Sequence, residues 1–228
     1  MTALLTSVRD LAEAELALGA GSEWLDLKEP RDGALGRVAP EVARDVVRWV
    51  AGRVPVSATI GDCWDEPECF AERAAEMAAT GVSHVKIGLY ARDLTAKTGR
   101  ALAAATAACP IIAVCFAEEP PAARDVARLA AAGLRGVMLD TAEKQAGSLR
   151  SLLAESALRE FVTTARGAGL LTGLAGSLSL ADVPPLLALG PDYLGFRGAL
   201  CVGQAREAML SADAVAAVKA AVARGRQV

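Results

Sequence analysis

Lysine is scarce in this chain of 228 residues, and three of its lysines stand at the ends of short apolar runs. Of 24 basic residues only five are lysine, namely Lys28, Lys86, Lys97, Lys144 and Lys219. Arginine supplies most of the positive surface charge, so lysine is expected at positions whose chemistry arginine cannot perform. Arginine is neither deprotonated in proteins nor able to form an imine. A lysine amine that is crowded by another cation or removed from water loses its proton more readily and becomes a nucleophile toward carbonyl carbons.

Carboxylates accompany these lysines. Asp26 precedes Lys28 by two residues, and Asp140 ends another apolar run shortly before Lys144. Alternation along an extended strand puts Asp26 and Lys28 on one face, and a carboxylate beside an imine can move protons. With Lys86 at the end of a further run, the pattern predicts Schiff-base chemistry on an aldehyde or ketone and leaves three lysines as candidates. The alternative is that these lysines only form salt bridges or bind an anion.

A second set of residues suits a phosphate. The segments AGSL and FRGA follow the last two apolar runs and contain Gly176, Ser177, Arg197 and Gly198. Glycine lets the backbone approach an anion closely, and serine and arginine side chains can donate hydrogen bonds to it. The alternative is that these are two tight turns that need glycine. Ser57, which shares a strand face with Thr59, is a further polar candidate.

The elements that must position these residues repeat along the chain. Ala-rich amphipathic segments end at glycine, and each is followed by a short apolar run typical of a parallel strand that is covered on both faces. Eight strand-and-helix units predict a (β/α)8 TIM barrel, as one domain over 1–228, with chemistry at the carboxyl ends of the strands. The rival is a doubly wound open sheet, but no G-x-G-x-x-G follows the first strand. The predicted strands are 3–7, 24–28, 55–59, 84–88, 111–116, 136–140, 170–175 and 192–196. The predicted helices are 9–19, 40–51, 67–80, 91–107, 121–132, 149–167, 180–189 and 205–224.

Composition excludes several functional classes. With 53% apolar residues and a net charge of −3, the chain is expected to be a globular, cytoplasmic protein that binds neither nucleic acid nor membrane. No signal peptide is recognisable at the start. The five cysteines are odd in number and form no C-x-x-C, which favours reduced thiols over disulfides or zinc. We expect no metal and no cofactor. Alanines on the outer helices suit a homo-oligomer as well as tight helix–sheet packing.

Each of four further residues has two alternative interpretations, one functional and one structural. His84 could be an acid or base, but its place deeper in the strand than Lys86 favours packing. Tyr90 could enter the barrel mouth or pack on the next helix, and Asp62 could cap a turn or contact substrate. Cys63 could be reactive, although a part-buried thiol is the ordinary interpretation.

Six segments together resemble the (5-formylfuran-3-yl)methyl phosphate synthase family, in order and over nearly the whole chain. They are DLKEPRDGALGR at 26–37, VSATIGD at 56–62, HVKIGLY at 84–90, MLDTAEK at 138–144, LAGSL at 174–178 and FRGALC at 196–201. The resemblance implies a lyase of methanofuran biosynthesis, which joins two molecules of glyceraldehyde 3-phosphate with loss of one phosphate and water. The Ala- and Arg-rich composition is typical of a high-GC bacterium. In such an organism the resemblance implies a methylotroph that uses a methanofuran-like carrier in formaldehyde oxidation.

The resemblance also assigns roles. Lys28 matches the Schiff-base lysine, and Lys86, Asp140 and Lys144 match the other catalytic positions. Binding or supporting roles fall to Asp26, Ser57, Gly176, Ser177, Arg197 and Gly198. The sequence departs from the family pattern at 63–70 and 115–121. Two other functions remain open: a different class I aldolase acting on a phosphorylated sugar, and a non-catalytic phosphate-binding barrel that regulates a partner.

Overall fold

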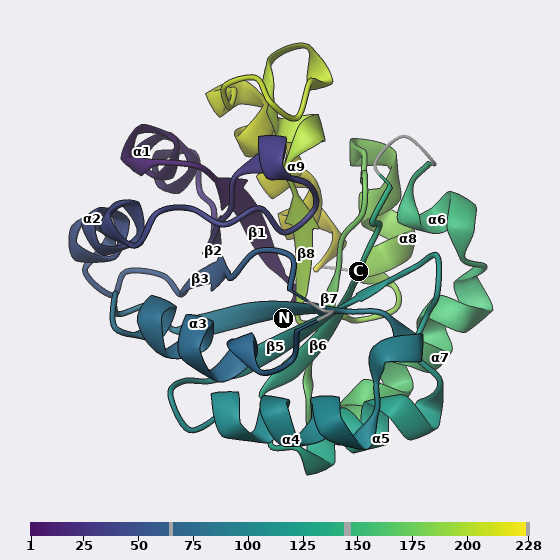
Figure 1. The fold of residues 1–228 in the computed structure, drawn as a ribbon. Coiled ribbons are helices and arrows are strands. Elements are labelled where there is room, and N and C mark those ends of the chain that lie inside the picture. Colours follow the sequence, from purple (N-terminus) through teal and green to yellow (C-terminus); the bar gives the residue numbers. More distant parts are fainter. Residues whose placement is uncertain (64–65, 144–146, 227–228) are drawn as a thin grey trace.

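Eight parallel strands close into a barrel in sequence order, as the spacing of the apolar runs predicts. The computed structural model describes residues 1–63, 66–143 and 147–226, and helices surround the strands in Figure 1. The strands are β1 (Ala3–Val8), β2 (Trp24–Leu27), β3 (Val56–Thr59), β4 (His84–Leu89), β5 (Ile111–Phe116), β6 (Gly136–Asp140), β7 (Leu171–Leu174) and β8 (Tyr193–Phe196). The predicted (β/α)8 barrel is confirmed, and the open sheet is wrong because β1 pairs with β8.

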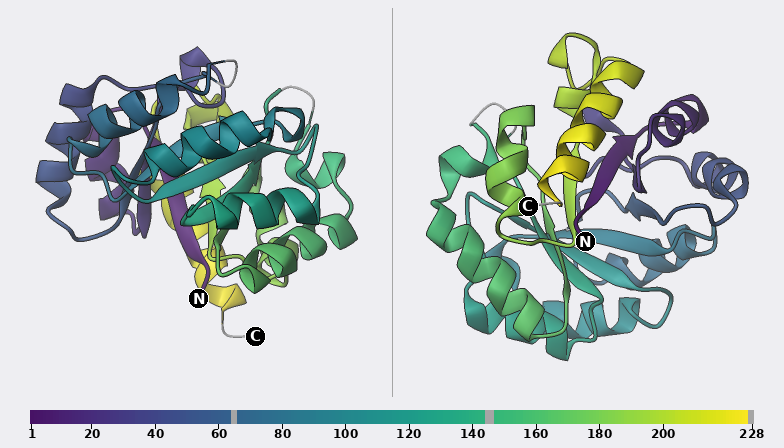
Figure 2. Two further views of the ribbon diagram at one scale, coloured as in Figure 1. Left: turned by 60° about the horizontal axis from the view of Figure 1, so that its bottom comes forward. Right: turned by 180° about the vertical axis from the view of Figure 1, so that it is seen from behind.

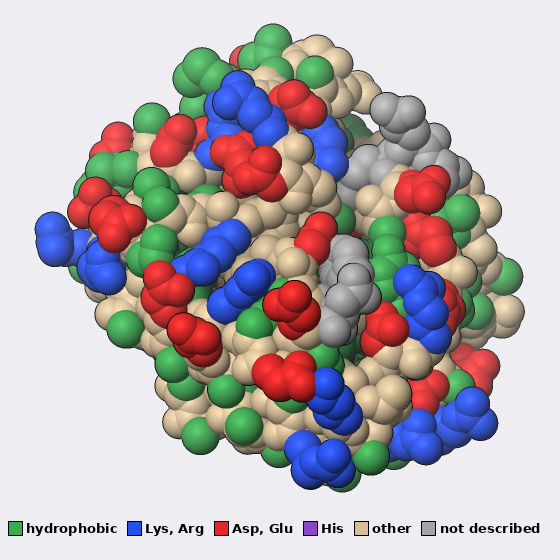
Figure 3. All heavy atoms as spheres, in the orientation of Figure 1, with side chains coloured by type: hydrophobic (Ala, Val, Ile, Leu, Met, Phe, Trp, Pro, Cys, Tyr) green, Lys and Arg blue, Asp and Glu red, His purple; other side chains and the backbone are tan. Residues whose placement is uncertain are grey.

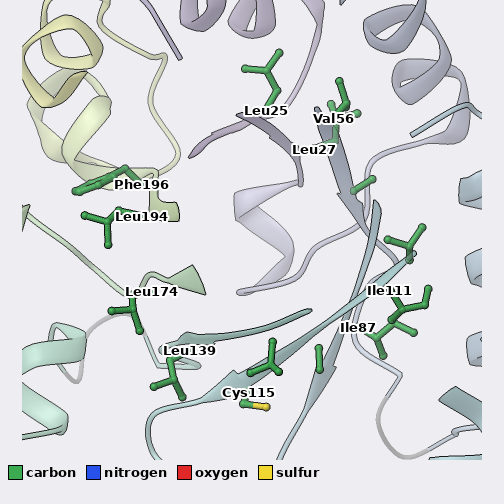
Figure 4. Packing of buried hydrophobic residues seen from close by; sticks show 14 of the residues in the cluster. Leu25, Leu27, Val56, Ile87, Ile111, Cys115, Leu139, Leu174, Leu194 and Phe196 are labelled. Carbon is green, nitrogen blue, oxygen red and sulfur yellow. The ribbon is translucent and has the colours of Figure 1, made fainter. Parts of the chain in front are cut away.

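Alternation along each strand divides the apolar residues between two cores. One set, labelled in Figure 4 by residues such as Leu25, Ile87 and Leu194, packs between strands and helices. The other lies inside the barrel and includes Ile112 and Tyr193. Burial on both faces explains why the strands read as continuous apolar runs. It also means that a polar side chain pointing inward must find its partners there.

The described helices are α1 (Leu11–Gly19), α2 (Pro40–Val50), α3 (Cys69–Ala78), α4 (Ala96–Ala105), α5 (Ala123–Ala131), α6 (Leu149–Leu152), α7 (Glu155–Gly167), α8 (Val183–Leu187) and α9 (Ala212–Gly225). Four of the predicted helices are clearly wrong in extent. The helix predicted over 149–167 is divided into α6 and α7 by extended backbone at Leu153 and Ala154. The helix predicted from 205 begins only at Ala212, after Ser211 caps its first turn.

The residues before α9 form an excursion at the end of β8. Two 3₁₀ turns, Gly198–Leu200 and Val202–Gln204, are followed by a bridge that pairs Cys201 with Leu210. 3₁₀ turns also replace the first residues of two other predicted helices, at Ala91–Asp93 and Leu180–Asp182. Short connections of this kind leave backbone at the barrel rim, where it can meet a ligand.

The first and last elements of the chain meet, as the views in Figure 2 indicate. The Nε of Arg226 donates to the carbonyl of Thr2 over 2.8 Å. Acidic and basic side chains are interspersed over the face seen in Figure 3, without a large basic patch. Within the described ranges, none of the helices has both the length and the apolar character needed to cross a bilayer. All five cysteines are free thiols.

Candidate active site

A cavity of about 740 Å³ opens at the carboxyl ends of the strands, the end where barrel enzymes carry their chemistry. It has the size of a small-molecule site. Eight of the ten residues singled out from the sequence are among those that line it: Asp26, Lys28, Lys86, Asp140, Gly176, Ser177, Arg197 and Gly198. Lys144 lies outside the described residues, and Ser57 lies beneath the cavity without lining it.

Lys86 is the most deeply placed of the described lysines. It leaves β4 and extends inside the barrel, where its side chain is 1% exposed and its Nζ lies 2.9 Å from Oδ1 of Asp26. Burial lowers the pKa of the Lys86 ammonium, and the nearby Lys28 cation lowers it further, whereas Asp26 and Asp140 oppose this shift. The ammonium therefore has a neutral form within reach, as proton transfer requires.

Lys28 pairs more loosely with a different carboxylate. It follows β2 directly, and its Nζ lies 4.0 Å from Oδ2 of Asp140, the last residue of β6. The other oxygen of Asp140 accepts a hydrogen bond of 2.7 Å from the amide of Thr141. This bond fixes the carboxylate and leaves Oδ2 toward the amine. The sequence prediction that these amines and carboxylates gather at one rim is thus confirmed for Lys28, Lys86, Asp26 and Asp140.

Ser57 and Trp24 support Asp26 from below. The Ser57 hydroxyl donates to Oδ1 of Asp26 over 2.5 Å and accepts from Nε1 of Trp24 over 3.1 Å. Ser57 is fully buried. From the family resemblance Ser57 is expected either to bind substrate or to support the site, and these contacts favour support.

The loop after β7 turns sharply at the cavity wall. Gly176 has φ +109°, and a Cβ there would lie 2.8 Å from Cγ2 and 3.0 Å from the amide nitrogen of Thr141. Ser177 follows with φ +47°. In the loop after the neighbouring strand β8, Gly198 begins a 3₁₀ turn, whose first amides lack partners within the turn. The backbone therefore lines the cavity from both loops, as a phosphate site would require.

Arg197 uses its side chain inside the protein. Its Nε donates to the carbonyl of Arg206, and its two terminal nitrogens donate to the carbonyls of Ser7 and Ala208 and to both oxygens of Glu13. A guanidinium has five N–H donors, and these five bonds use all of them. The geometry does not support the expectation that this side chain donates to a phosphate. It links β8 and the rim excursion to α1.

Arg206 is a cavity residue that the sequence analysis missed. It lies in the excursion before α9, is half-buried, and donates from Nη2 to the carbonyl of Gly33 over 2.8 Å. Burial lowers the pKa of its guanidinium, and the nearby Asp140 carboxylate opposes this shift. An arginine remains charged in such surroundings and can recognise an anion. Position 206 falls within the helix predicted over 205–224, where an arginine reads as ordinary surface charge.

The four residues with alternative interpretations do not line the cavity. They are His84, Tyr90, Asp62 and Cys63. His84 begins β4 and stacks against Trp24 at 4.9 Å between ring centroids, and burial lowers its pKa to about 4, assisted by Lys86 and Arg135. Tyr90 stacks on Phe116 at 4.7 Å. These contacts favour packing roles.

Asp62 and Cys63 stand in the loop after β3. Asp62 lies beside Gly33, and burial raises the pKa of its carboxyl. Burial and a hydrogen bond with Cys69 raise the pKa of the Cys63 thiol to about 12. A thiol of this kind has little thiolate, so the geometry favours the ordinary interpretation of Cys63.

Comparison with known proteins places the chain among synthases. A solved structure of a phosphoribosyl anthranilate isomerase from Thermus thermophilus has the same fold, with a TM-score of 0.69 and 19% identity, covering 98% of this chain and 99% of that one. A protein of Methylorubrum extorquens, provisionally named a (5-formylfuran-3-yl)methyl phosphate synthase, is 46% identical over 220 residues, which are 95% of this chain and 90% of that one.

The (5-formylfuran-3-yl)methyl phosphate synthase of Methanosarcina mazei is 36% identical over 214 residues, which are 88% of this chain and 91% of that one. The sequence model of the 4-HFC-P synthase family matches residues 4–219. The resemblance found in the six motifs is confirmed, and the chain belongs to the 4-HFC-P synthase family.

Proposed function

We propose that this protein condenses two molecules of glyceraldehyde 3-phosphate to (5-formylfuran-3-yl)methyl phosphate in the cytoplasm, for a methanofuran-type cofactor, through an imine on Lys28. The observation that carries the proposal is the convergence of two amines and two carboxylates in one cavity. The names of the relatives support the product, and the lysines support the chemistry.

The first part of the reaction forms an enamine. The Lys28 amine adds to the aldehyde carbon of one triose phosphate, and water leaves to give an iminium. A base removes the proton from the adjacent carbon, and the electron pair moves into the iminium. We assign this role to Oδ2 of Asp140, because it lies 4.0 Å from Nζ of Lys28 while Oδ1 is held by the Thr141 amide. Lys86 is the second group able to carry protons, because burial favours its neutral form.

The second part joins the molecules and closes the ring. The enamine expels its phosphate and leaves an enol whose terminal carbon is nucleophilic. The second triose phosphate isomerises to its ketone, and the terminal carbon attacks that ketone carbon to form the new carbon–carbon bond. The free terminal hydroxyl of the second molecule closes the ring on the C2 carbonyl of the first, and loss of water and hydrolysis of the imine leave the aromatic furan aldehyde. In total the atoms balance when one phosphate and two molecules of water leave. The aromatic product makes the eliminations favourable.

Two phosphates must be held, and we assign them to two parts of the cavity wall. The backbone at Gly176, Ser177 and Gly198 suits the phosphate that is retained. Arg206, near Asp140, suits the phosphate of the other molecule, because its guanidinium is charged and lines the cavity. Arg197 would then support this rim from behind.

The test is to trap the imine with borohydride in the presence of glyceraldehyde 3-phosphate and to locate the adduct by peptide mass spectrometry. We expect the adduct on Lys28 and an ultraviolet-absorbing furan in the untreated reaction. Lys28→Arg keeps the charge but forms no imine, so turnover should fall about a thousandfold or more. Lys97→Arg is the matched control, because Lys97 is an exposed residue that pairs with Glu68.

Each failure has a distinct meaning. An adduct on Lys86, or none at all, contradicts the role of Lys28. An adduct on Lys28 without a furan chromophore favours another class I aldolase. Full function in Lys28→Arg favours a non-catalytic phosphate-binding barrel.

A further inference from the structure

A chain of buried polar contacts runs beneath the cavity. It leads from Nε1 of Trp24 to Oγ of Ser57 over 3.1 Å, from Ser57 to Oδ1 of Asp26 over 2.5 Å, and from the same oxygen to Nζ of Lys86 over 2.9 Å. Each of the four residues is at most 8% exposed. Contacts of this kind inside an apolar core are strong, because little water competes for them.

The direction of each hydrogen bond is fixed by the groups involved. The indole nitrogen can only donate, so Ser57 accepts from Trp24 and its own proton is free for Asp26. The alternative acceptor of that proton, the carbonyl of Leu25, is 3.5 Å away. An ionised carboxylate can only accept, so Oδ1 of Asp26 accepts the Ser57 hydroxyl, and the same oxygen forms the ion pair with the Lys86 ammonium. The two groups share the charge of that oxygen.

Ser57 and Trp24 do not line the cavity, whereas Asp26 and Lys86 do. Trp24 is held in place by its neighbours, with its ring centroid 4.9 Å from that of His84 and 5.0 Å from that of Tyr193. Neither Ser57 nor Trp24 can therefore act on a substrate directly. Their hydrogen-bonded route to the cavity runs through Asp26.

We propose that Ser57 and Trp24 are positioning residues that act through Asp26 to set how firmly Lys86 holds its proton. The use of Lys86 as a proton carrier rests on the proposed function; the control of its ionisation does not. By occupying Oδ1 of Asp26, the Ser57 hydroxyl weakens the attraction between that oxygen and the ammonium. Trp24 makes the hydroxyl a better donor to Asp26, because it commits the serine oxygen as an acceptor.

Other charges face Lys86, and the proposal takes them into account. The titratable groups around its amine come from β2, β4, β6 and β8, and they are Asp26, Lys28, His84, Asp140 and Tyr193. Loss of the Ser57 hydroxyl leaves all of these in place. The change in Lys86 should therefore have one sign, toward tighter proton binding.

The experiment is a titration of lysine side chains by nuclear magnetic resonance, with carbon-13 at Cε. The chain has only five lysines, so the signals are few and each is assigned with a lysine-to-arginine variant. In Ser57→Ala, the titration midpoint of Lys86 should rise by about one pH unit, the effect of losing one hydrogen bond to a charged group. Trp24→Phe keeps the ring and should give a smaller rise, and Ser57→Thr should restore the original midpoint.

Ser22→Ala is the matched control. Ser22 is a buried serine whose hydroxyl bonds to that of Thr6 over 2.6 Å, without contact to Asp26. It should leave the Lys86 midpoint unchanged although it removes a similar buried hydrogen bond. Circular dichroism checks that each variant is folded. If Ser57→Ala does not fold, the Lys86 midpoint in Trp24→Phe decides whether the inference holds.

The outcome separates this inference from the proposed function. An unchanged Lys86 midpoint in Ser57→Ala and Trp24→Phe, or an equal change in Ser22→Ala, overturns the inference even when Lys28 forms its adduct. A raised midpoint without furan production supports the inference and contradicts the proposed function. When both hold, the acid limb of the kcat profile in Ser57→Ala should move to higher pH, with KM changed less than twofold.

Discussion

Replacement of Arg197 by methionine should destabilise the protein without weakening substrate binding. The guanidinium is 6% exposed and lies against Glu13, which is 2% exposed. Arg197→Met leaves the Glu13 carboxylate buried without this partner and removes donors from three carbonyls. The methionine keeps much of the packing of the arginine stem, so the loss is chiefly electrostatic.

The expected size of this effect follows from the contacts that remain. Removal of one partner from a buried ion pair costs about 3–5 kcal/mol. Arg9 still contacts Glu13, with its Nη2 3.1 Å and its amide 3.0 Å from the carboxylate oxygens. We therefore expect the lower end, about 3 kcal/mol of the free energy of unfolding. For a chain of this length that lowers Tm by about 6–12 °C.

Urea unfolding and calorimetry measure the stability, and steady-state kinetics with glyceraldehyde 3-phosphate measure KM. Arg159→Met is the control, because Arg159 pairs with Glu155 on the exposed face of α7 over 2.6 Å and should change stability by about 0.5 kcal/mol or less. KM should stay within about twofold, since Arg197 has no donor to spare. Unchanged stability with KM raised tenfold or more would refute this reasoning and make Arg197 a phosphate ligand.

Three further outcomes are expected. Gly173→Ala should cost about 1–3 kcal/mol in urea unfolding, because its Cβ would lie 2.2 Å from the Tyr193 ring, whereas Gly167→Ala, with open space around it, should cost nothing. Arg206→Gln should raise KM about tenfold with little change in stability, because an exposed contact to the carbonyl of Gly33 is the one described hydrogen bond of its side chain; an unchanged KM would exclude it from phosphate binding. Burial alone would raise the pKa of Glu23, but hydrogen bonds from Arg226 and Lys219 lower it to about 2, so its stabilisation is complete above pH 4.5 and disappears as pH falls toward 2. Glu23→Gln should therefore flatten the pH dependence of unfolding across that window, and an unchanged slope there would contradict it.

The fold could be predicted because local rules and tertiary structure agree along most of the chain. Glycine separates a helix from the apolar run that follows it before β2, β4, β6, β7 and β8, and all eight runs are buried on both faces. The errors occur where local patterns continue but tertiary contacts stop the helix. Residues 149–167 have helical periodicity throughout, yet extended backbone at Leu153 and Ala154 divides them.

Only those site residues that lie at the ends of strands could be predicted from the sequence. Parallel strands bring their carboxyl ends together, so Lys28 and Asp140 were expected to meet and do so. The sequence pattern does not show how far a side chain extends or which residue it contacts. Arg197 bonds to Glu13, which is 184 residues away in the chain, and no local signal connects them. Arg206 was hidden within a predicted helix that does not extend so far.

The arrangement of the site follows from how a closed barrel fills its interior. Layers of inward side chains come from alternate strands. In the described part of the barrel, the lysines and aspartates of the cavity wall come from β2, β4 and β6 or directly follow them, and Arg197 directly follows β8. The intervening strands and their ends supply residues such as Leu5, Val114 and Ala175. Each charged strand therefore has uncharged neighbours, and the side chains meet across the interior instead of along the sheet. This spacing lets Lys28 and Lys86 share one cavity while each pairs with its own carboxylate. It is the separation of these two pairs, one tight and one loose, that allows two amines of the same kind to differ in their chemistry.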